Sequence, residues 1–172
     1  MNTISICTEK DIPIIIAVAL QSYNEHYLHL WYDNGEWYKQ RCFTPEILRE
    51  EMSDSNAIFY LLYDNDSPVG FLKLNLHKKL DPYTDADCLE LERIYIIKAG
   101  TGKGIGKQAI QFTLDLARQL KKKFIWLKAM DTSDAIFFYE KIGFKEINTT
   151  RLDYDLMKEE FRGMVVYVYQ VG

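Results

Sequence analysis

The sequence is poor in cysteine, proline and long apolar runs. Its three cysteines, Cys7, Cys42 and Cys88, are scattered and form no CxxC pair, which argues against a disulfide framework or a zinc site. The apolar run over 12–20 is too short to cross a membrane and follows no basic leader. A formal net charge of −4 argues against nucleic acid as a partner and permits a cationic substrate. We therefore expect a cytoplasmic protein that binds no metal, membrane or nucleic acid.

The overall composition is that of one compact domain over residues 1–172. The chain is 48% hydrophobic, enough for one substantial core, and no repeat, low-complexity tract or linker divides it. Strand and helix patterns alternate only in the middle of the chain, which predicts an α/β fold with a mixed sheet of about six or seven strands and helices on both faces. The expected strands cover 3–7, 58–63, 69–76, 88–97, 124–129, 144–148 and 164–171, and the expected helices cover 15–30, 44–52, a segment after the glycines at 102–106, and 132–142.

The stretch from Leu91 to Gly106 carries the strongest functional signal. An apolar strand runs into a glycine-dense loop, and the loop opens directly into an amphipathic helix. Glycines at alternate positions, Gly102, Gly104 and Gly106, let the backbone approach a ligand and turn its N–H groups toward it. The helix N-terminus adds free N–H groups and a partial positive charge. The loop is therefore predicted to bind an anion, in particular a phosphate or pyrophosphate.

The spacing of these glycines disfavours two common phosphate ligands. A Walker A loop requires Gly-Lys after a glycine and four residues, and neither Gly100 nor Gly102 meets that frame. The dinucleotide fingerprint fails as well, because Ile105 or Lys107 stands where its third glycine belongs. The spacing therefore argues against ATP and NAD.

Two segments resemble the GCN5-related N-acetyltransferases. Residues 101–106, Thr-Gly-Lys-Gly-Ile-Gly, are similar to that family's acyl-CoA loop, Gln/Arg-x-x-Gly-x-Gly/Ala, with Thr101 at the Gln/Arg position. Residues 135–144 resemble the family's Ala-x-x-Phe-Tyr-x-Lys-x-Gly-Phe ending, and Thr132 stands where many members carry Asn. The resemblance covers roughly residues 56–150 and the N-terminal third only in outline. Two motifs in the right order and separation are more specific than either alone.

The resemblance implies acetyl-CoA as the cofactor. Backbone N–H groups of the loop would hold the pyrophosphate, the preceding strand would pair with the pantetheine arm, and a bulge in that strand would aim an N–H at the thioester carbonyl. Plain sheet core is the competing interpretation of the apolar residues in this strand. The implied cofactor-binding residues are Ile94, Tyr95, Ile96, Thr101, Gly102, Lys103, Gly104, Ile105, Gly106, Lys107, Thr132, Phe138 and Tyr139.

Acetyl transfer to an amine requires removal of a proton from the amine, whose pKa is about 10.4 in a lysine-like group, and a proton for the departing thiolate. The resemblance makes Tyr139 the acid, with a core-packed aromatic as the alternative. Glu92 is a candidate base acting through water. By strand alternation it shares a face with Ile94 and with Glu90, one pleat away, whereas Arg93 lies on the other face and forms a salt bridge to a helix. A surface carboxylate is the alternative for Glu92. No cysteine is placed for covalent catalysis, so direct attack in a ternary complex is expected.

The acceptor is expected to contact the N-terminal helices and the segment 31–38. Trp31, Tyr32, Asp33 and Trp37 suit an ammonium group, because aromatic faces and carboxylates both attract one. Simple apolar packing over the core edge is the competing interpretation. The acceptor is a primary amine, either a small molecule such as a polyamine or a protein amine. A non-catalytic acyl-CoA-binding regulatory or interaction domain is the alternative function.

Three further expectations concern packing. The helix after the loop should bury one stripe of residues (Ile105, Ala109, Phe112, Leu116 and Leu120). The run 121–123 of three lysines should be a solvated helix end. The C-terminal strand, 164–171, would form a sticky edge if left uncovered, and a homodimer could form there.

Overall fold

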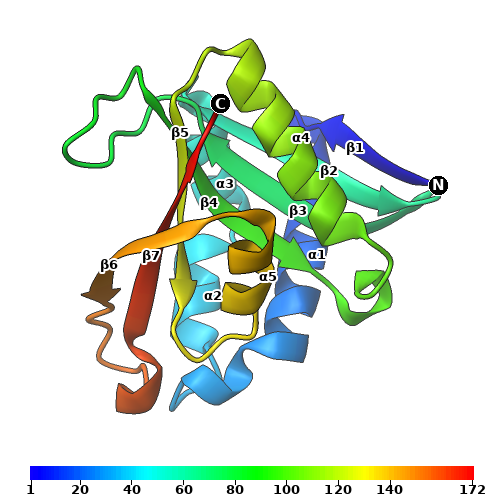
Figure 1. Ribbon diagram of the computed structural model, residues 1–172. Helices are drawn as coiled ribbons and strands as arrows, with labels where there is room; N and C mark the ends of the chain where they lie inside the picture. The colour runs from blue at the N-terminus through cyan, green and yellow to red at the C-terminus, as the bar shows by residue number, and fades with distance from the viewer.

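The computed structural model describes residues 1–172 and contains one seven-stranded sheet (Figure 1). Its strand order is β1-β2-β3-β4-β5-β7-β6, and every neighbouring pair is antiparallel except the parallel pair β4–β5. The predicted mixed sheet is thus confirmed. The strands are β1 (Asn2–Ile6), β2 (Ala57–Asp64), β3 (Ser67–Asn75), β4 (Cys88–Ile96), β5 (Phe124–Met130), β6 (Lys145–Arg151) and β7 (Gly163–Gln170).

Helices cover both faces of the sheet, as predicted. In Figure 1, α4 and α5 lie in front of it and the three N-terminal helices lie behind. Each covers the sheet because one side of the helix is apolar, and a core of 33 residues joins all these layers. No helix combines the length and apolarity needed to span a membrane. The helices are α1 (Ile12–His26), α2 (Glu36–Cys42), α3 (Pro45–Ser53), α4 (Ile105–Gln119) and α5 (Ala135–Ile142).

The N-terminal helices differ from the expectation. A helix over 15–30 was expected, but α1 ends at His26 and residues 28–30 form a separate 3-10 turn. No helix was expected between residues 31 and 44, whereas α2 occupies Glu36–Cys42. Gly35 has φ 77° and lets the chain turn directly into α2, and the Asp33 carboxylate accepts hydrogen bonds from the N–H groups of Gly35 and Trp37 at 2.9 and 2.8 Å.

Two packing expectations around α4 were wrong in part. Ile105 and Ala109 are buried as predicted, but Leu120 lies beyond the end of α4 and is 40% exposed. The buried face continues through Ile110, Thr113, Leu114 and Ala117 instead. Lys122 is not solvated: it is 4% exposed, and its ammonium lies 2.8 Å from His77 Nδ1 and donates to the carbonyls of Asp85 and Ala86. The chain turns sharply at Lys121, φ 56°, and so carries Lys122 inward.

The C-terminal strand is not an edge of the sheet. β7 pairs with β5 on one side and with β6 on the other, so the edges are β1 and β6. Every residue of β6 is exposed, and most of them are polar. The basis for a dimer through residues 164–171 is therefore removed, because the backbone of β7 is already paired.

The parallel pair at the centre of the sheet is short. β4 and β5 pair only where Cys88–Glu90 face Phe124–Trp126, and the two strands separate beyond that point. On its other side, β4 stays paired with β3 through Ile96. The sheet thus consists of two halves joined over three residue pairs, and the gap between them opens toward the carboxyl ends of both strands.

Candidate active site

A cavity of about 500 Å³ lies in the gap between β4 and β5. Leu91–Tyr95 form one wall and Leu127–Met130 the other. Residues of α1 and α2 reach it from behind the sheet and Tyr139 of α5 from the front, so the cavity is lined from both faces. Of its 25 lining residues 18 are hydrophobic, which places its few charged groups in a largely apolar surround.

A bulge in β4 sets which side chains enter the cavity. Lys73 pairs with Arg93 and Leu74 with Leu91, so Glu92 has no partner residue on β3. The extra residue breaks the strict alternation of side chains, so Glu90, Glu92 and Arg93 lie on the same face of the sheet, where they contact Asn75, Lys73 and Glu51 respectively. Two expectations were therefore wrong: Glu92 does not share a face with Ile94, and Arg93 is not opposite Glu92. The salt bridge from Arg93 to a helix is confirmed, with Glu51 of α3.

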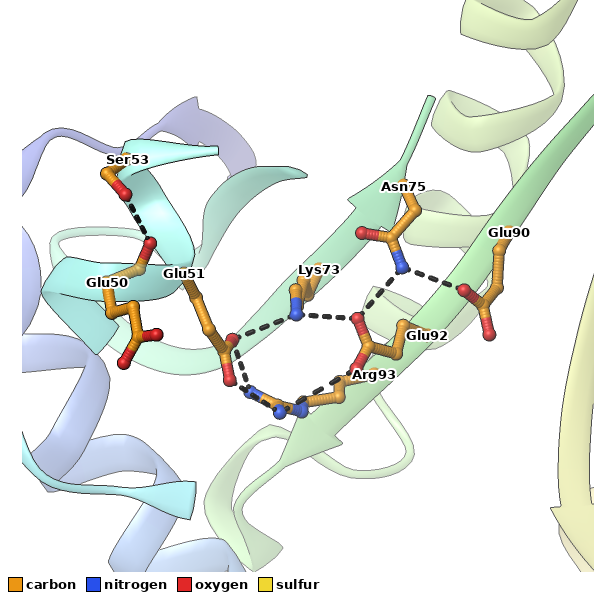
Figure 2. Close-up of polar contacts among 8 residues, drawn as sticks. All are labelled: Glu50, Glu51, Ser53, Lys73, Asn75, Glu90, Glu92 and Arg93. Atoms are coloured by element: carbon orange, nitrogen blue, oxygen red, sulfur yellow. Dashed lines mark hydrogen bonds and ion pairs between the residues drawn. The ribbon is translucent and has the colours of Figure 1, made fainter. Parts of the chain in front are cut away.

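Four charged residues form one ion cluster at the bulge (Figure 2). Lys73 Nζ lies 2.6 Å from Glu92 and 2.9 Å from Glu51, and the Arg93 guanidinium makes two hydrogen bonds to Glu51 at 2.9 and 3.0 Å. A longer contact of 3.7 Å joins Arg93 to Glu92. Burial raises the pKa of the Glu92 carboxyl, but the hydrogen bond from Lys73 and the charges of Arg93 and Lys73 outweigh it and lower that pKa. Glu92 is thus held ionised.

Glu90 lies beside this cluster without an ion pair of its own. Its carboxylate accepts a hydrogen bond from Asn75 Nδ2 at 2.7 Å, and the same amide donates to Glu92 at 2.9 Å (Figure 2). Burial in the cavity wall raises the pKa of the Glu90 carboxyl. The two glutamates therefore differ: Glu92 is neutralised by cations, and Glu90 is the more basic group.

Lys73 is predicted to stabilise the fold as the bridge between Glu51 and Glu92. In Lys73→Met, Arg93 is the only cation left to pair with the carboxylates of Glu51 and Glu92 in the cavity wall. We therefore expect the free energy of unfolding to fall by about 3 kcal/mol. Urea unfolding measures this as a lower midpoint with an unchanged slope. As a control, Arg118→Met breaks only an exposed pair with Asp115 and should cost about 0.5 kcal/mol or less. Equal effects of both substitutions would contradict this role.

The glycine loop lies at the end of β4 and keeps its N–H groups free. Gly102 and Gly104 have φ of 74° and 78°, and a Cβ on either would meet nothing within 4 Å. The N–H groups of residues 102–104 donate no hydrogen bond within the chain. Those of residues 105–107 lie in the first turn of α4, where an N–H group has no carbonyl of a preceding helical turn to donate to. Six consecutive donors thus have no partner in the chain, and the space beside Gly102 and Gly104 is open, which suits an anion.

The other residues expected at the cofactor are placed unequally. Ile94 and Tyr95 line the cavity, whereas the Ile96 carbonyl accepts from Ser22 Oγ at 3.3 Å and lies 3.0 Å from His26 Nε2. Gly106 lies within contact distance of Ile96 and Phe138. Apart from Ile94, Tyr95 and Tyr139, none of the expected cofactor residues lines the cavity. Thr132 and Lys107 are exposed and Ile105 is buried in the core. Thr101 donates to the Lys98 carbonyl, and Lys103 forms an ion pair with Asp64 at 2.5 Å.

Tyr139 lies where the two halves of the sheet part. It is 7% exposed, lines the cavity, and its hydroxyl has no hydrogen-bond partner in the chain. Burial raises the pKa of Tyr139, and Tyr27 of α1 adds to that rise. Tyr27 and Tyr139 both line the cavity, although their elements lie on opposite faces of the sheet. A buried phenol of raised pKa stays protonated and is available as a proton donor.

The residues expected to bind the acceptor separate into one that lines the cavity and three that do not. Trp31 is 2% exposed and lines it, and its indole N–H donates to Tyr23 at 2.7 Å. Tyr32 is 69% exposed and Asp33 caps α2, so both lie outside, as does Trp37. The sequence reasoning missed further aromatic lining residues, which come from separate elements and share no motif: Tyr23, Tyr27, Tyr38 and Tyr154.

Comparison with known proteins shows a family and several proteins to which this chain is similar. Residues 18–144 match the model of the acetyltransferase (GNAT) family. An uncharacterized N-acetyltransferase in the pepI 3′ region of Lactobacillus delbrueckii subsp. lactis is 27% identical over 141 residues, which are 79% of this chain and 80% of that protein.

Solved structures share the fold. The PaiA N-acetyltransferase from Thermoplasma acidophilum, in complex with coenzyme A, superposes with a TM-score of 0.77 at 19% identity, covering 99% of each chain. The ribosomal-protein-S18-alanine N-acetyltransferase from Escherichia coli gives a TM-score of 0.71 at 17% identity, over 99% of this chain and 94% of that one. At these identities the likeness concerns the fold alone.

Proposed function

This chain belongs to the acetyltransferase (GNAT) family, and on that basis we propose that it transfers the acetyl group of acetyl-CoA to a primary amine by direct attack in a ternary complex. The observation that carries the proposal is the gap between β4 and β5: Tyr139 and Glu90 line the cavity in this gap, and the glycine loop with its free donors follows the end of β4. The resemblance seen in the two sequence motifs is confirmed at the level of the family.

The residues present fit the donor. The six free N–H groups at 102–107 suit a pyrophosphate, and β4 beyond Glu90 has no strand partner on the β5 side, which suits the amides of a pantetheine arm. Gly106, Ile96 and Phe138 would form the apolar floor between these two parts. When bound, acetyl-CoA supplies an activated acetyl group; the chain supplies the positioning and the proton transfers.

We assign the proton transfers to groups on the two sides of the gap. Tyr139 donates its phenolic proton to the departing sulfur. The amine must lose a proton before or during attack, and the sequence placed Glu92 in this role. The ion pairs of Glu92 with Lys73 and Arg93 make it the weaker base, so we propose that Glu90 accepts the proton and that Glu92 holds Lys73 and Asn75 in place.

The acceptor amine enters from the side of α1 and α2. Trp31 and its aromatic neighbours line this part of the cavity, which accommodates a small amine or an extended protein amine. We place the enzyme in the cytoplasm as a further proposal, because Cys7, Cys42 and Cys88 are all unpaired.

Calorimetric titration with acetyl-CoA, with ATP and NAD as controls, tests the donor. We expect acetyl-CoA alone to bind, and Gly104→Val to weaken it about tenfold or more, because a side chain at φ 78° strains the loop and covers its N–H groups. Gly172→Val, at the chain end, is the matched control and should bind normally. A folded protein that fails to bind acetyl-CoA would refute the proposal. Binding without turnover of any amine would support the non-catalytic acyl-CoA-binding alternative.

A further inference from the structure

We infer that the acceptor is a small amine that also carries a carboxylate on an apolar body, as in an α-amino acid with an apolar side chain, and that Arg41 binds this carboxylate. The inference rests on the proposed acetyl transfer and narrows its acceptor. Three features of the cavity support it: an unpaired guanidinium, an excess of unpaired cations, and an aromatic wall.

Arg41 stands apart from the other arginines of the chain. Each of the others lies within 4.0 Å of a carboxylate (Arg49, Arg93, Arg118, Arg151 and Arg162). Arg41 has no such partner, and it is an exposed residue that lines the cavity beside Tyr38 and Cys42. Its guanidinium lies 5.2 Å from the centroid of the Trp37 ring, which is itself outside the cavity. Stacking orients the guanidinium and leaves its in-plane N–H donors free, which suits a planar carboxylate.

The remaining charges of the cavity leave a surplus of cations. Glu51 and Glu92 are neutralised by Lys73 and Arg93. Lys128 lines the β5 wall without a carboxylate partner and lies over the Trp126 ring at 6.0 Å. Glu90 is therefore the one carboxylate of the lining without an ion pair, and Arg41 and Lys128 are exposed cations of the lining without a carboxylate partner. An acceptor with several amines would meet one attractive and two repulsive groups, whereas one amine and one carboxylate match the site.

An aromatic wall indicates the rest of the acceptor. The rings of Trp31 and Tyr38 stack at 5.1 Å, Tyr154 lies 5.8 Å from Trp31, and Tyr23 and Tyr27 complete the surface behind β4. Such a surface is matched by an apolar or aromatic body rather than by a hydrated chain of amines. A volume of about 500 Å³ suits a single small molecule beside the reacting end of the donor.

Matched pairs of acceptors test the inference through thiol release from acetyl-CoA. L-Phenylalanine and L-leucine are compared with phenethylamine and isoamylamine, which lack the carboxylate, with L-phenylalaninamide, and with spermidine. We expect kcat/KM to be at least about tenfold higher for the amino acids. Arg41→Gln should lower it about tenfold for the amino acids, mainly through KM, and leave the amide and the simple amines unchanged. Arg49→Gln, at an arginine outside the cavity, is the control and should change nothing.

The outcomes separate this inference from the proposed function. Three outcomes would overturn the inference and leave acetyl transfer intact. The first is an equal kcat/KM within each pair, and the second is a higher kcat/KM for spermidine. The third is an Arg41→Gln variant that loses activity toward all acceptors to the same degree. An amide as good as the free acid would point to peptide amines and would also overturn it. No turnover of any of these acceptors by a protein that binds acetyl-CoA counts against it too. Failure to bind acetyl-CoA would instead refute the proposed function.

Discussion

Tyr139→Phe should reduce kcat about a hundredfold or more while leaving the affinity for acetyl-CoA unchanged. The phenol is buried at the parting of β4 and β5, has no hydrogen-bond partner in the chain, and has a pKa raised by burial, so it is protonated at neutral pH. Removing one oxygen from a residue that otherwise packs against Phe144 and Tyr167 preserves the ring contacts. Steady-state kinetics and calorimetry on the same preparation measure the two quantities.

Tyr167→Phe is the matched control for this experiment. Its hydroxyl donates to Glu140 at 2.9 Å outside the cavity, so its loss should leave kcat unchanged. Unchanged turnover in Tyr139→Phe would remove the proposed acid. Equal losses in kcat for both variants would show that the effect comes from packing rather than from proton transfer.

Glu90→Gln should lower kcat/KM about a hundredfold and remove the acidic limb of its pH profile. In the wild type, activity rises with pH as Glu90 deprotonates. Because burial raises the pKa of Glu90, this rise occurs at a higher pH than the ordinary pKa of a carboxyl group would give. Glu92→Gln should retain the limb, because the pKa of Glu92 is lowered by its cations and it is already ionised in that range. Its main effect should be on stability, through the lost ion pair with Lys73.

The pair of glutamates serves as its own control, since both lie on one strand and both bind Asn75. If Glu92→Gln abolishes the limb and Glu90→Gln keeps it, the base is Glu92, as the sequence first indicated. If neither variant changes the profile, the proton leaves through solvent rather than through a carboxylate of the chain.

The sequence predicted best what depends on neighbours along the chain. The glycine loop, α5 with its end at Gly143, and the seven strands follow from local patterns of glycine, charge and apolar spacing. The fold class followed from the order of these elements. Tyr139, which lines the cavity, was indicated by the resemblance of residues 135–144 to the family's motif rather than by a local pattern.

The sequence could not predict features that depend on pairing between distant segments. The family resemblance implied a bulge in this strand, but no residue type in β4 marks its position at Glu92, where it inverts the faces of Arg93 and Ile94. The partner of Lys73 and Arg93 is Glu51, on a helix that only the folded chain brings to β4. Arg41 could not be predicted because α2 is only seven residues long, which is too short for an apolar period to be recognised.

The brief pairing of β4 with β5 places the catalytic groups on two halves of one sheet. The half containing β1–β4 carries the glycine loop and both glutamates, and Tyr139 lies on α5, which follows β5 and precedes β6 in the other half. Within the sheet three residue pairs join the halves, and α4 and the bridge between Trp31 and Met157 connect them elsewhere. The distance between proton donor and proton acceptor therefore depends on the angle at which β4 and β5 diverge. Substitutions at Cys88 or Trp126, remote from the reacting atoms, should tune turnover by changing that angle without altering any group that takes part in the chemistry.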